Sequence, residues 1–269
     1  MTDLALNDSS IWIINRDIAL FLGVLTLLAA VFRLQPRLVP KWAGVKQFCE
    51  FLKDSWWEVA LVFILRAFFL ELYMIPSSSM QPTVYPGDVI LVSKYPYGFK
   101  WPGLNTTFLD VGKPQAGETV VFLDPKAPTV RKMIKRVIGC PGDHVSITGS
   151  QIVINGMPLS TKYLYQDVDY IEQNGKSYRL DVQYFEQEIG THNPVIAQMP
   201  QMISTTGDLD FTVPADHYFV MGDNRSNSQD SRYMGFVPSR FICGRAEYVV
   251  MSFGTRNGHY DFSRIGRIG

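Results

Sequence analysis

Two long apolar stretches lie in the first 75 residues of this 269-residue chain, and no comparable stretch follows them. A helix needs about 20 mainly apolar residues to cross a hydrocarbon core of about 30 Å. The stretches come close to that length, so we predict transmembrane helices at residues 18–34 and 56–75. The first is not a good removable signal peptide, because no basic segment precedes it and no clean small-residue cleavage site follows it.

Charged residues between the two stretches set their orientation. The region is basic, with Arg33, Arg37, Lys41, Lys46 and Lys53 against only Glu50 and Asp54. Basic residues collect in cytoplasmic loops, so we expect residues 35–55 inside and the short N-terminus, residues 1–17, outside. Arg66 interrupts the second stretch and leaves two interpretations open. Either it reaches the outer headgroups from a membrane helix, or the whole segment is a buried helix of a soluble domain.

Beyond Pro76 the pattern changes to short alternating runs separated by turn residues. Such runs are typical of β-strands, and they occur at residues 89–92, 119–122, 134–138, 145–148 and 152–154. The pairs Asn155-Gly156 and Asn174-Gly175 are typical of hairpin turns. We therefore predict that residues 76–269 form an all-β domain outside the cytoplasmic membrane. Residues from about 156 to 215 alternate less cleanly and are expected to form an insertion.

Ser79 is the first candidate for chemistry, in a serine-rich turn directly after the second apolar stretch. Pro76 stops the preceding segment, since its ring removes a backbone donor. A nucleophilic hydroxyl needs nearby donors for the oxyanion, and the Ser79 N–H and the Ser77 hydroxyl could supply them. On its own, a serine-rich turn after a membrane segment is more often a solvated linker.

Lys135 could provide a base for that serine. It lies in a probable strand whose pleat places it on the same face as Met133 and Val137. A lysine, with an ordinary pKa of about 10.4, must be desolvated before it can act as a base near neutral pH. Lysines desolvated in this way activate serine hydroxyls. The alternative is an edge-strand lysine whose amine reaches water.

A third polar segment runs from Gly222 to Arg232 between apolar strands. Its Asp and Asn residues could suggest calcium, but the terminal Glu and central Gly of an EF-hand loop are missing. The side chains could instead support an active site, with Ser228 bonded to the lysine amine and Asp230 paired with Arg232. A solvated polar loop is the remaining interpretation.

Composition excludes several other classes of function. Lysine plus arginine and aspartate plus glutamate both number 25, which lacks the basic excess typical of nucleic-acid binding. The three cysteines have no metal-ligand spacing. Cys49 is expected to be reduced in the cytoplasmic loop, and Cys140 and Cys243 are expected to be free unless the fold brings them together. No histidine or nucleotide-binding motif is present.

Together the three segments resemble bacterial type I signal peptidases, also called leader peptidases. The resemblance rests on Ser77-Ser78-Ser79-Met80-Gln81-Pro82-Thr83, on Lys135-Arg136 with Gly139-Cys140-Pro141-Gly142-Asp143, and on the segment from Gly222 to Gly235. It implies a membrane-anchored all-β fold of the signal-peptidase/LexA-like type: two N-terminal transmembrane helices and an extracytoplasmic catalytic β domain with a variable β insertion. It also implies a serine endopeptidase that cleaves signal peptides from exported pre-proteins after small residues at −1 and −3.

The resemblance assigns roles to individual residues. Ser79 would be the nucleophile and Lys135 the general base of a Ser/Lys dyad, and Ser77 would join the Ser79 N–H in the oxyanion hole. Ser228, Asp230 and Arg232 would support the site. The remaining four would line the substrate pockets: Ile75, Pro76, Val84 and Ile134.

The resemblance further implies partners and a location. The partners would be signal peptides, the lipid bilayer and the secretion translocon, with no nucleic acid, metal or cofactor. The location would be the bacterial inner membrane, with the catalytic domain on the periplasmic side. Two alternatives stay open: a Ser-Lys autoprotease of the LexA type, against which the absence of a helix-turn-helix region argues, and a non-enzymatic anchored envelope protein.

Overall fold

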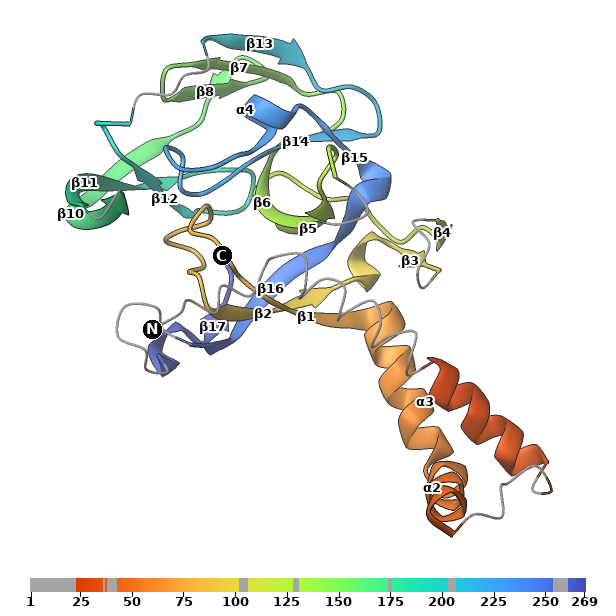
Figure 1. Ribbon diagram of the computed structural model, residues 1–269. Helices are drawn as coiled ribbons and strands as arrows, with labels where there is room; N and C mark the ends of the chain where they lie inside the picture. The colour runs from red at the N-terminus through yellow and green to blue at the C-terminus, as the bar shows by residue number, and fades with distance from the viewer. Residues whose placement is uncertain are drawn as a thin grey trace.

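The computed structural model describes residues 23–35, 37, 43–101, 106–127, 131–173, 176–202, 207–253 and 261–269. A helical arm, drawn in red and orange, projects from a body made of β-strands (Figure 1). The arm comes from residues before Leu70, and the body from the described residues that follow. This division agrees with the change of sequence pattern near Pro76, although it falls somewhat earlier in the chain.

The arm contains helical residues 23–34, α2 (Ala43–Asp54), α3 (Trp56–Ile64) and a π-helical turn (Leu65–Phe69). Within the described part of the chain, no helix is both long enough and apolar enough to cross a membrane. The two transmembrane helices therefore stay predictions. The predicted N-terminal segment, residues 1–17, and the start of the first predicted helix lie outside the described residues.

The expectation that residues 56–75 form one helix is wrong at its C-terminal end. The helical conformation stops at Phe69, and β1 (Leu70–Met74) pairs antiparallel with β2 (Asp88–Ser93). The physical reason is the alternation within these residues: Glu71 and Tyr73 are buried on one face, whereas Leu72 is exposed on the other. An apolar run that contains such an alternation can end as a strand even though its mean hydropathy suits a helix.

The main sheet of the body has the strand order β1-β2-β16-β5-β6-β14-β15, and β17 pairs with β16. Its further strands are β5 (Thr119–Leu123), β6 (Lys132–Gly139), β14 (His217–Met221), β15 (Val237–Pro238), β16 (Ile242–Ser252) and β17 (Gly266–Arg267). All neighbours are antiparallel. The short helix α4 (Ser231–Met234) lies between β14 and β15 in the chain.

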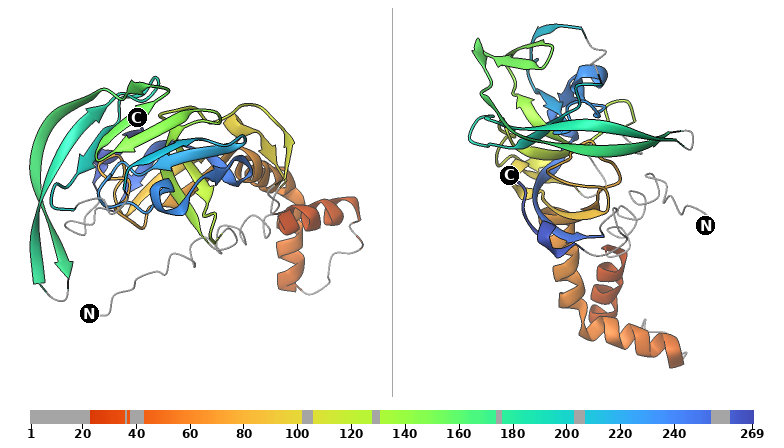
Figure 2. Two further views of the ribbon diagram at one scale, coloured as in Figure 1. Left: turned by 90° about the horizontal axis from the view of Figure 1, so that it is seen from above. Right: turned by 90° about the vertical axis from the view of Figure 1, so that its left-hand side faces the viewer.

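Three smaller sheets accompany the main one. The first has the order β13-β7-β8-β9, the second the order β10-β11-β12, and the third pairs β3 with β4. Their strands are β3 (Phe99–Lys100), β4 (Thr107–Leu109), β7 (His144–Thr148), β8 (Gln151–Ile154), β9 (Met157–Pro158), β10 (Thr161–Gln173), β11 (Lys176–Gln187), β12 (Val195–Gln198) and β13 (Leu209–Thr212). The predicted insertion, residues 156–215, thus supplies the long β10–β11 ribbon that extends from the body in Figure 2.

The sequence-based strand predictions are largely confirmed. Each of the five predicted runs lies in a strand, namely β2, β5, β6, β7 and β8. The Asn155-Gly156 turn is also confirmed, because both residues have positive φ, 52° and 80°, as a hairpin turn of this kind requires. Asn174-Gly175 lies outside the described residues, although Gln173 and Lys176 on either side are paired.

Curling of the main sheet brings β1 and β6 together, although they are not neighbours in it. The Lys132 amine at the start of β6 lies 2.7 Å from the Tyr73 hydroxyl of β1. Pairing between β6 and β14 covers Arg136 to Gly139, so among the described strands the first half of β6 pairs with β5 alone. An open cleft therefore lies between the β1 segment and the first half of β6.

Candidate active site

Ser79 lies in the turn that follows β1 at one end of this cleft. The turn is held by backbone hydrogen bonds, from Gln81 N–H to the Ser78 carbonyl (3.1 Å) and from Val84 N–H to the Met80 carbonyl (3.1 Å). The Met80 side chain is fully buried in the core beneath. Anchoring of Met80 leaves the neighbouring Ser79 half-buried at the surface of the cleft.

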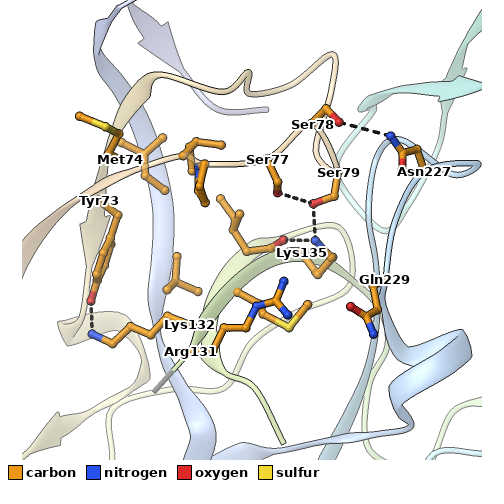
Figure 3. Close-up of a pocket in the computed structure, with 16 residues that line it drawn as sticks. Tyr73, Met74, Ser77, Ser78, Ser79, Arg131, Lys132, Lys135, Asn227 and Gln229 are labelled. Atoms are coloured by element: carbon orange, nitrogen blue, oxygen red, sulfur yellow. Dashed lines mark hydrogen bonds between the residues drawn. The ribbon is translucent and has the colours of Figure 1, made fainter. Parts of the chain in front are cut away.

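Lys135 reaches Ser79 from β6. Its amine lies 2.5 Å from the Ser79 Oγ and 2.9 Å from the Ile134 carbonyl, and the residue is only 3% exposed (Figure 3). Burial disfavours the charged amine and lowers the pKa of Lys135 to about 8, against an opposing effect of Asp230 and Asp223. A large fraction of the amine is therefore neutral near pH 8 and can accept a proton from the serine.

Ser77 lies beside the nucleophile candidate on the open side of the turn. Its hydroxyl is 3.4 Å from the Ser79 Oγ, and the residue is exposed. Its position agrees with the predicted contribution to an oxyanion hole, where a donor must lie close to the developing negative charge. The role of Ser77 stays a prediction.

The polar segment after β14 packs against the serine turn. The Asn224 N–H donates to the Ser79 carbonyl (3.2 Å), and its side-chain amide donates to the Ser78 carbonyl (3.3 Å). The Asn227 amide donates to the Ser78 hydroxyl at 3.3 Å. The predicted supporting loop therefore contacts the turn through its asparagines, which the sequence had not singled out.

Asp230 and Arg232 are paired, as predicted. The Arg232 Nε lies 2.9 Å from the Asp230 Oδ1, and the Gly222 N–H donates to Asp230 at 2.9 Å. Burial alone would raise the pKa of Asp230, but the hydrogen bond and charge of Arg232, together with the Gly222 N–H, outweigh burial and lower it. Ser228 is also buried, yet within the described residues its hydroxyl makes no hydrogen bond to Lys135. Its role in orienting the lysine therefore stays a prediction.

A buried ion pair of Arg136 and Asp223 braces the site. The Arg136 Nε and one Nη lie 2.8 and 2.7 Å from the two Asp223 oxygens, and the guanidinium also donates to the carbonyls of Gly117 and Gly269. The Thr83 hydroxyl donates to Asp223 at 2.5 Å, which ties the pair to the serine turn. The Lys135-Arg136 dipeptide was the only sequence signal for it.

The predicted substrate-binding residues separate into two groups. Ile75, Pro76 and Ile134 line the cleft, together with Ile90 and Val121, which the sequence had not indicated. Val84 does not line it: the side chain is fully buried in the core below.

Cys140 and Cys243 are free and only half-buried, so the expectation of free thiols is confirmed.

The insertion contacts the supporting loop through β12. The Ala197 N–H donates to the Asp223 carbonyl and the Arg225 N–H donates to the Ala197 carbonyl, each at 2.9 Å. The Met199 N–H donates to the Ser226 hydroxyl at 2.8 Å. These hydrogen bonds connect residues that lie far apart in the sequence, and no local pattern predicted them.

Comparisons with known proteins identify the family of this chain. The sequence profile of the family described as "Signal peptidase, peptidase S26" matches residues 49–251. A signal peptidase I of Pseudomonas aeruginosa is 35% identical over 232 residues, which cover 81% of this chain and 78% of that protein. The corresponding protein of Pseudomonas fluorescens is 36% identical, with the same coverage.

More distant relatives carry the same name. A signal peptidase I of Haemophilus influenzae is 30% identical over 249 residues, covering 77% of this chain and 71% of that protein. A crystal structure of a signal peptidase I from Enterococcus faecalis V583 is 28% identical, with a TM-score of 0.30, and covers 49% of this chain and 96% of that one. The family profile and the Pseudomonas relatives show that this chain belongs to the signal peptidases of the peptidase S26 family.

Proposed function

We propose that this chain is a serine endopeptidase that removes signal peptides from exported pre-proteins, with Ser79 as nucleophile and Lys135 as general base. The observation that carries the assignment is the 2.5 Å separation of the Lys135 amine and the Ser79 Oγ, with the amine buried. A general base must lie within hydrogen-bond distance of the group that it deprotonates, about 2.6–3.2 Å between the two heavy atoms, and this contact lies close to the short end of that range.

The reaction follows from this contact. Neutral Lys135 takes the Ser79 proton as the Oγ attacks the carbonyl carbon of residue −1, and the carbonyl electrons move to its oxygen. The Ser79 N–H and the Ser77 hydroxyl stabilise that oxyanion. Protonated Lys135 then delivers its proton to the leaving amine of the mature protein. Water, deprotonated by the lysine, attacks the acyl-enzyme and releases the signal peptide.

The cleft explains the choice of substrate. An extended peptide that enters it can pair with the segment after β1 and with the first half of β6, where β14 does not reach. The floor beneath it carries apolar side chains, among them Ile75, Ile134 and Val121. These branched side chains already fill much of the floor, so the space that remains suits small side chains at −1 and −3 and not large ones.

The arm supports a location at the membrane. It carries the apolar helix α3, whose sequence is WWEVALVFI, immediately before the body. We propose that the residues before Phe69 anchor the chain in the bacterial inner membrane with the body on the periplasmic side. The bilayer and the secretion translocon are then its neighbours. Ser79 follows the arm closely in sequence, near the position where the cleavage site of an inserted signal peptide emerges.

A cleavage assay with matched variants tests the proposal. A pre-protein with Ala-x-Ala directly before the first residue of its mature part is incubated with the full chain. The masses of the products are then measured by mass spectrometry. Ser79→Ala and Lys135→Met are each expected to abolish cleavage. The exposed residues Ser150 and Lys162, changed to Ala and Met, serve as controls and are expected to leave cleavage unchanged. Cleavage near the wild-type rate by either dyad variant would contradict the mechanism.

A further inference from the structure

The cleft has a charged end opposite the dyad. Tyr73 and Lys132 line it there, and we call these two residues the distal end of the cleft (Figure 3). The Lys132 amine donates to the Tyr73 hydroxyl at 2.7 Å and lies 3.6 Å from the Glu71 Oε1. The other Glu71 oxygen lies 2.7 Å from the Lys94 amine.

One carboxylate thus faces two lysine amines. Burial alone would raise the pKa of Glu71, but the charges of Lys132 and Lys94 outweigh burial and lower it to about 2. Glu71 is therefore fully ionised at physiological pH, and the three groups together carry one net positive charge. The side chain of Lys132 is 22% exposed, whereas that of Glu71 is 8% exposed, so a ligand in the cleft meets the lysine first.

Strand geometry tells which substrate residue reaches this end. Lys132 and Lys135 are three residues apart in β6, or about 10 Å at about 3.3 Å per residue. A substrate held extended with residue −1 at Ser79 therefore places residue −4 level with Lys132 and residue −5 about 3.3 Å beyond it. Side chains alternate between faces, so residues −1, −3 and −5 all point to the floor of the cleft. The Lys132 amine turns toward this floor, where it meets Tyr73.

We propose that Lys132 binds the side chain of substrate residue −5, so that the enzyme prefers an acidic residue there and disfavours a basic one. This inference rests on the proposed function and adds a charge preference at residue −5 to the substrate class given there. Apolar pockets select residues −1 and −3 by size, whereas the distal end selects residue −5 by charge. Pre-proteins with Asp or Glu at −5 are the preferred substrates.

Synthetic substrates provide the test. Three peptides share Ala at −1 and −3 and carry Glu, Gln or Lys at −5, and kcat/KM is measured for each with the full chain in detergent. The wild type should cleave the Glu peptide about tenfold more efficiently than the Lys peptide, with the Gln peptide between them, as attraction and repulsion of partly exposed charges add. This ratio should fall when the salt concentration is raised from about 0.05 M to about 0.5 M, because salt screens exposed charges.

Variants assign the effect to Lys132. In Lys132→Gln the ratio for the Glu and Lys peptides should fall toward one, and in Lys132→Arg it should be kept. Lys162→Gln removes the same charge from an exposed position on β10 and should keep the wild-type ratio. If Lys132→Gln does not fold, the Lys132→Arg variant and the salt dependence still test whether a positive charge at residue 132 selects the residue at −5.

Several results would overturn the inference. Equal kcat/KM for the three peptides with the wild type would contradict it directly. So would a ratio that Lys132→Gln leaves unchanged. A matching peptide set varied at −4 checks the register, and a preference at −4 but not at −5 would exclude the arrangement given above. In these cases the peptides are still cleaved, so the proposed function stands; cleavage of none of them would overturn both proposals.

Discussion

Lys135 and Arg136 are neighbours in β6, but their side chains serve opposite faces of the strand. The Lys135 amine contacts the Ser79 Oγ at 2.5 Å, whereas the Arg136 guanidinium binds both oxygens of Asp223. Asp223 acts to raise the pKa of Lys135, and Arg136 compensates that carboxylate within the buried region. The pleat thus keeps a permanent cation away from the nucleophile and pairs it with a carboxylate that would otherwise be buried without compensation.

The rate should depend on pH through this lysine. Only neutral Lys135 can take the serine proton, and its pKa is lowered to about 8. We therefore expect kcat/KM to rise about tenfold per pH unit below pH 8 and to level off above it. The measurement is kcat/KM for a peptide substrate between about pH 6 and 10, with chemistry shown to be limiting. A profile that is flat between pH 6 and 9 would exclude Lys135 as the base.

Stability should depend on pH in the same region, and its sign can be worked out. The folded pKa of Lys135 lies below the unfolded value of about 10.4, so the unfolded chain binds more protons between these two values. The free energy of unfolding should therefore rise with pH between about 8 and 10.4. Below pH 8 the desolvated lysine lowers the stability, by roughly 3 kcal/mol from this difference in pKa.

Lys135→Met should remove that loss of stability. The apolar side chain fits a buried position, so the variant should be more stable than the wild type at pH 7 while it is inactive. Urea unfolding at pH 7 and pH 10 measures the effect, and the gain should be smaller at pH 10. Lys162→Met is the control, since the lysine is exposed and its removal should change little. A Lys135→Met variant less stable than the wild type at pH 7 would contradict the prediction.

Gly222 should tolerate no side chain. A Cβ atom at this position would lie 2.4 Å from the Ser79 carbonyl oxygen and 2.6 Å from the Ser228 Cβ. The backbone of the serine turn or of the loop would have to shift, and a small displacement of a nucleophile costs about 100-fold in rate. We expect Gly222→Ala to lower kcat by roughly that factor.

Gly207 offers a matched control for this substitution. A Cβ atom there would have no neighbour within 4 Å among the residues that the structure describes, and Gly207→Ala should keep full activity. Peptide cleavage and thermal unfolding are measured for both variants. Wild-type kcat in Gly222→Ala would show that the close approach of the two backbones does not position Ser79.

The Arg136–Asp223 pair should matter far more for stability than a surface pair. Both side chains are 0% exposed, and removal of one partner leaves a buried charge without compensation. We expect Arg136→Met to lower the free energy of unfolding by about 3–5 kcal/mol. The exposed pair of Arg179 and Asp181 is the comparison, at 3.5 Å, and Arg179→Met should change stability by less than about 1 kcal/mol. Denaturant unfolding of the two variants measures the difference, and equal losses would refute the argument.

Much of the site could be predicted from the sequence because its chemistry lies in short contiguous motifs. Ser79, Lys135, Asp230 and Arg232 each occur in a segment whose polar residues interrupt an apolar pattern. The structure brings Ser79 and Lys135 together and pairs Asp230 with Arg232. Strands with clean alternation were equally predictable, since their period reflects burial on one face.

The remaining features depend on contacts between distant segments. The end of the second apolar stretch forms β1, where the buried Glu71 pairs with Lys94 and Lys132, and mean hydropathy contains no information on these partners. The resemblance assigned Val84 to the cleft, but its burial depends on how the turn packs. The bonds from Asn224 to the serine turn likewise require the tertiary structure.

The hydrogen bonds of β12 set a boundary for redesign of the insertion. Ala197 and Met199 bond to the backbone and side chains of the loop that contacts the Ser78 and Ser79 carbonyls. The exposed part of the β10–β11 ribbon makes none of these bonds. An engineer who wishes to shorten the protein, or to graft a reporter peptide onto it, can work in that ribbon and should leave the segment from Val195 to Met199 intact.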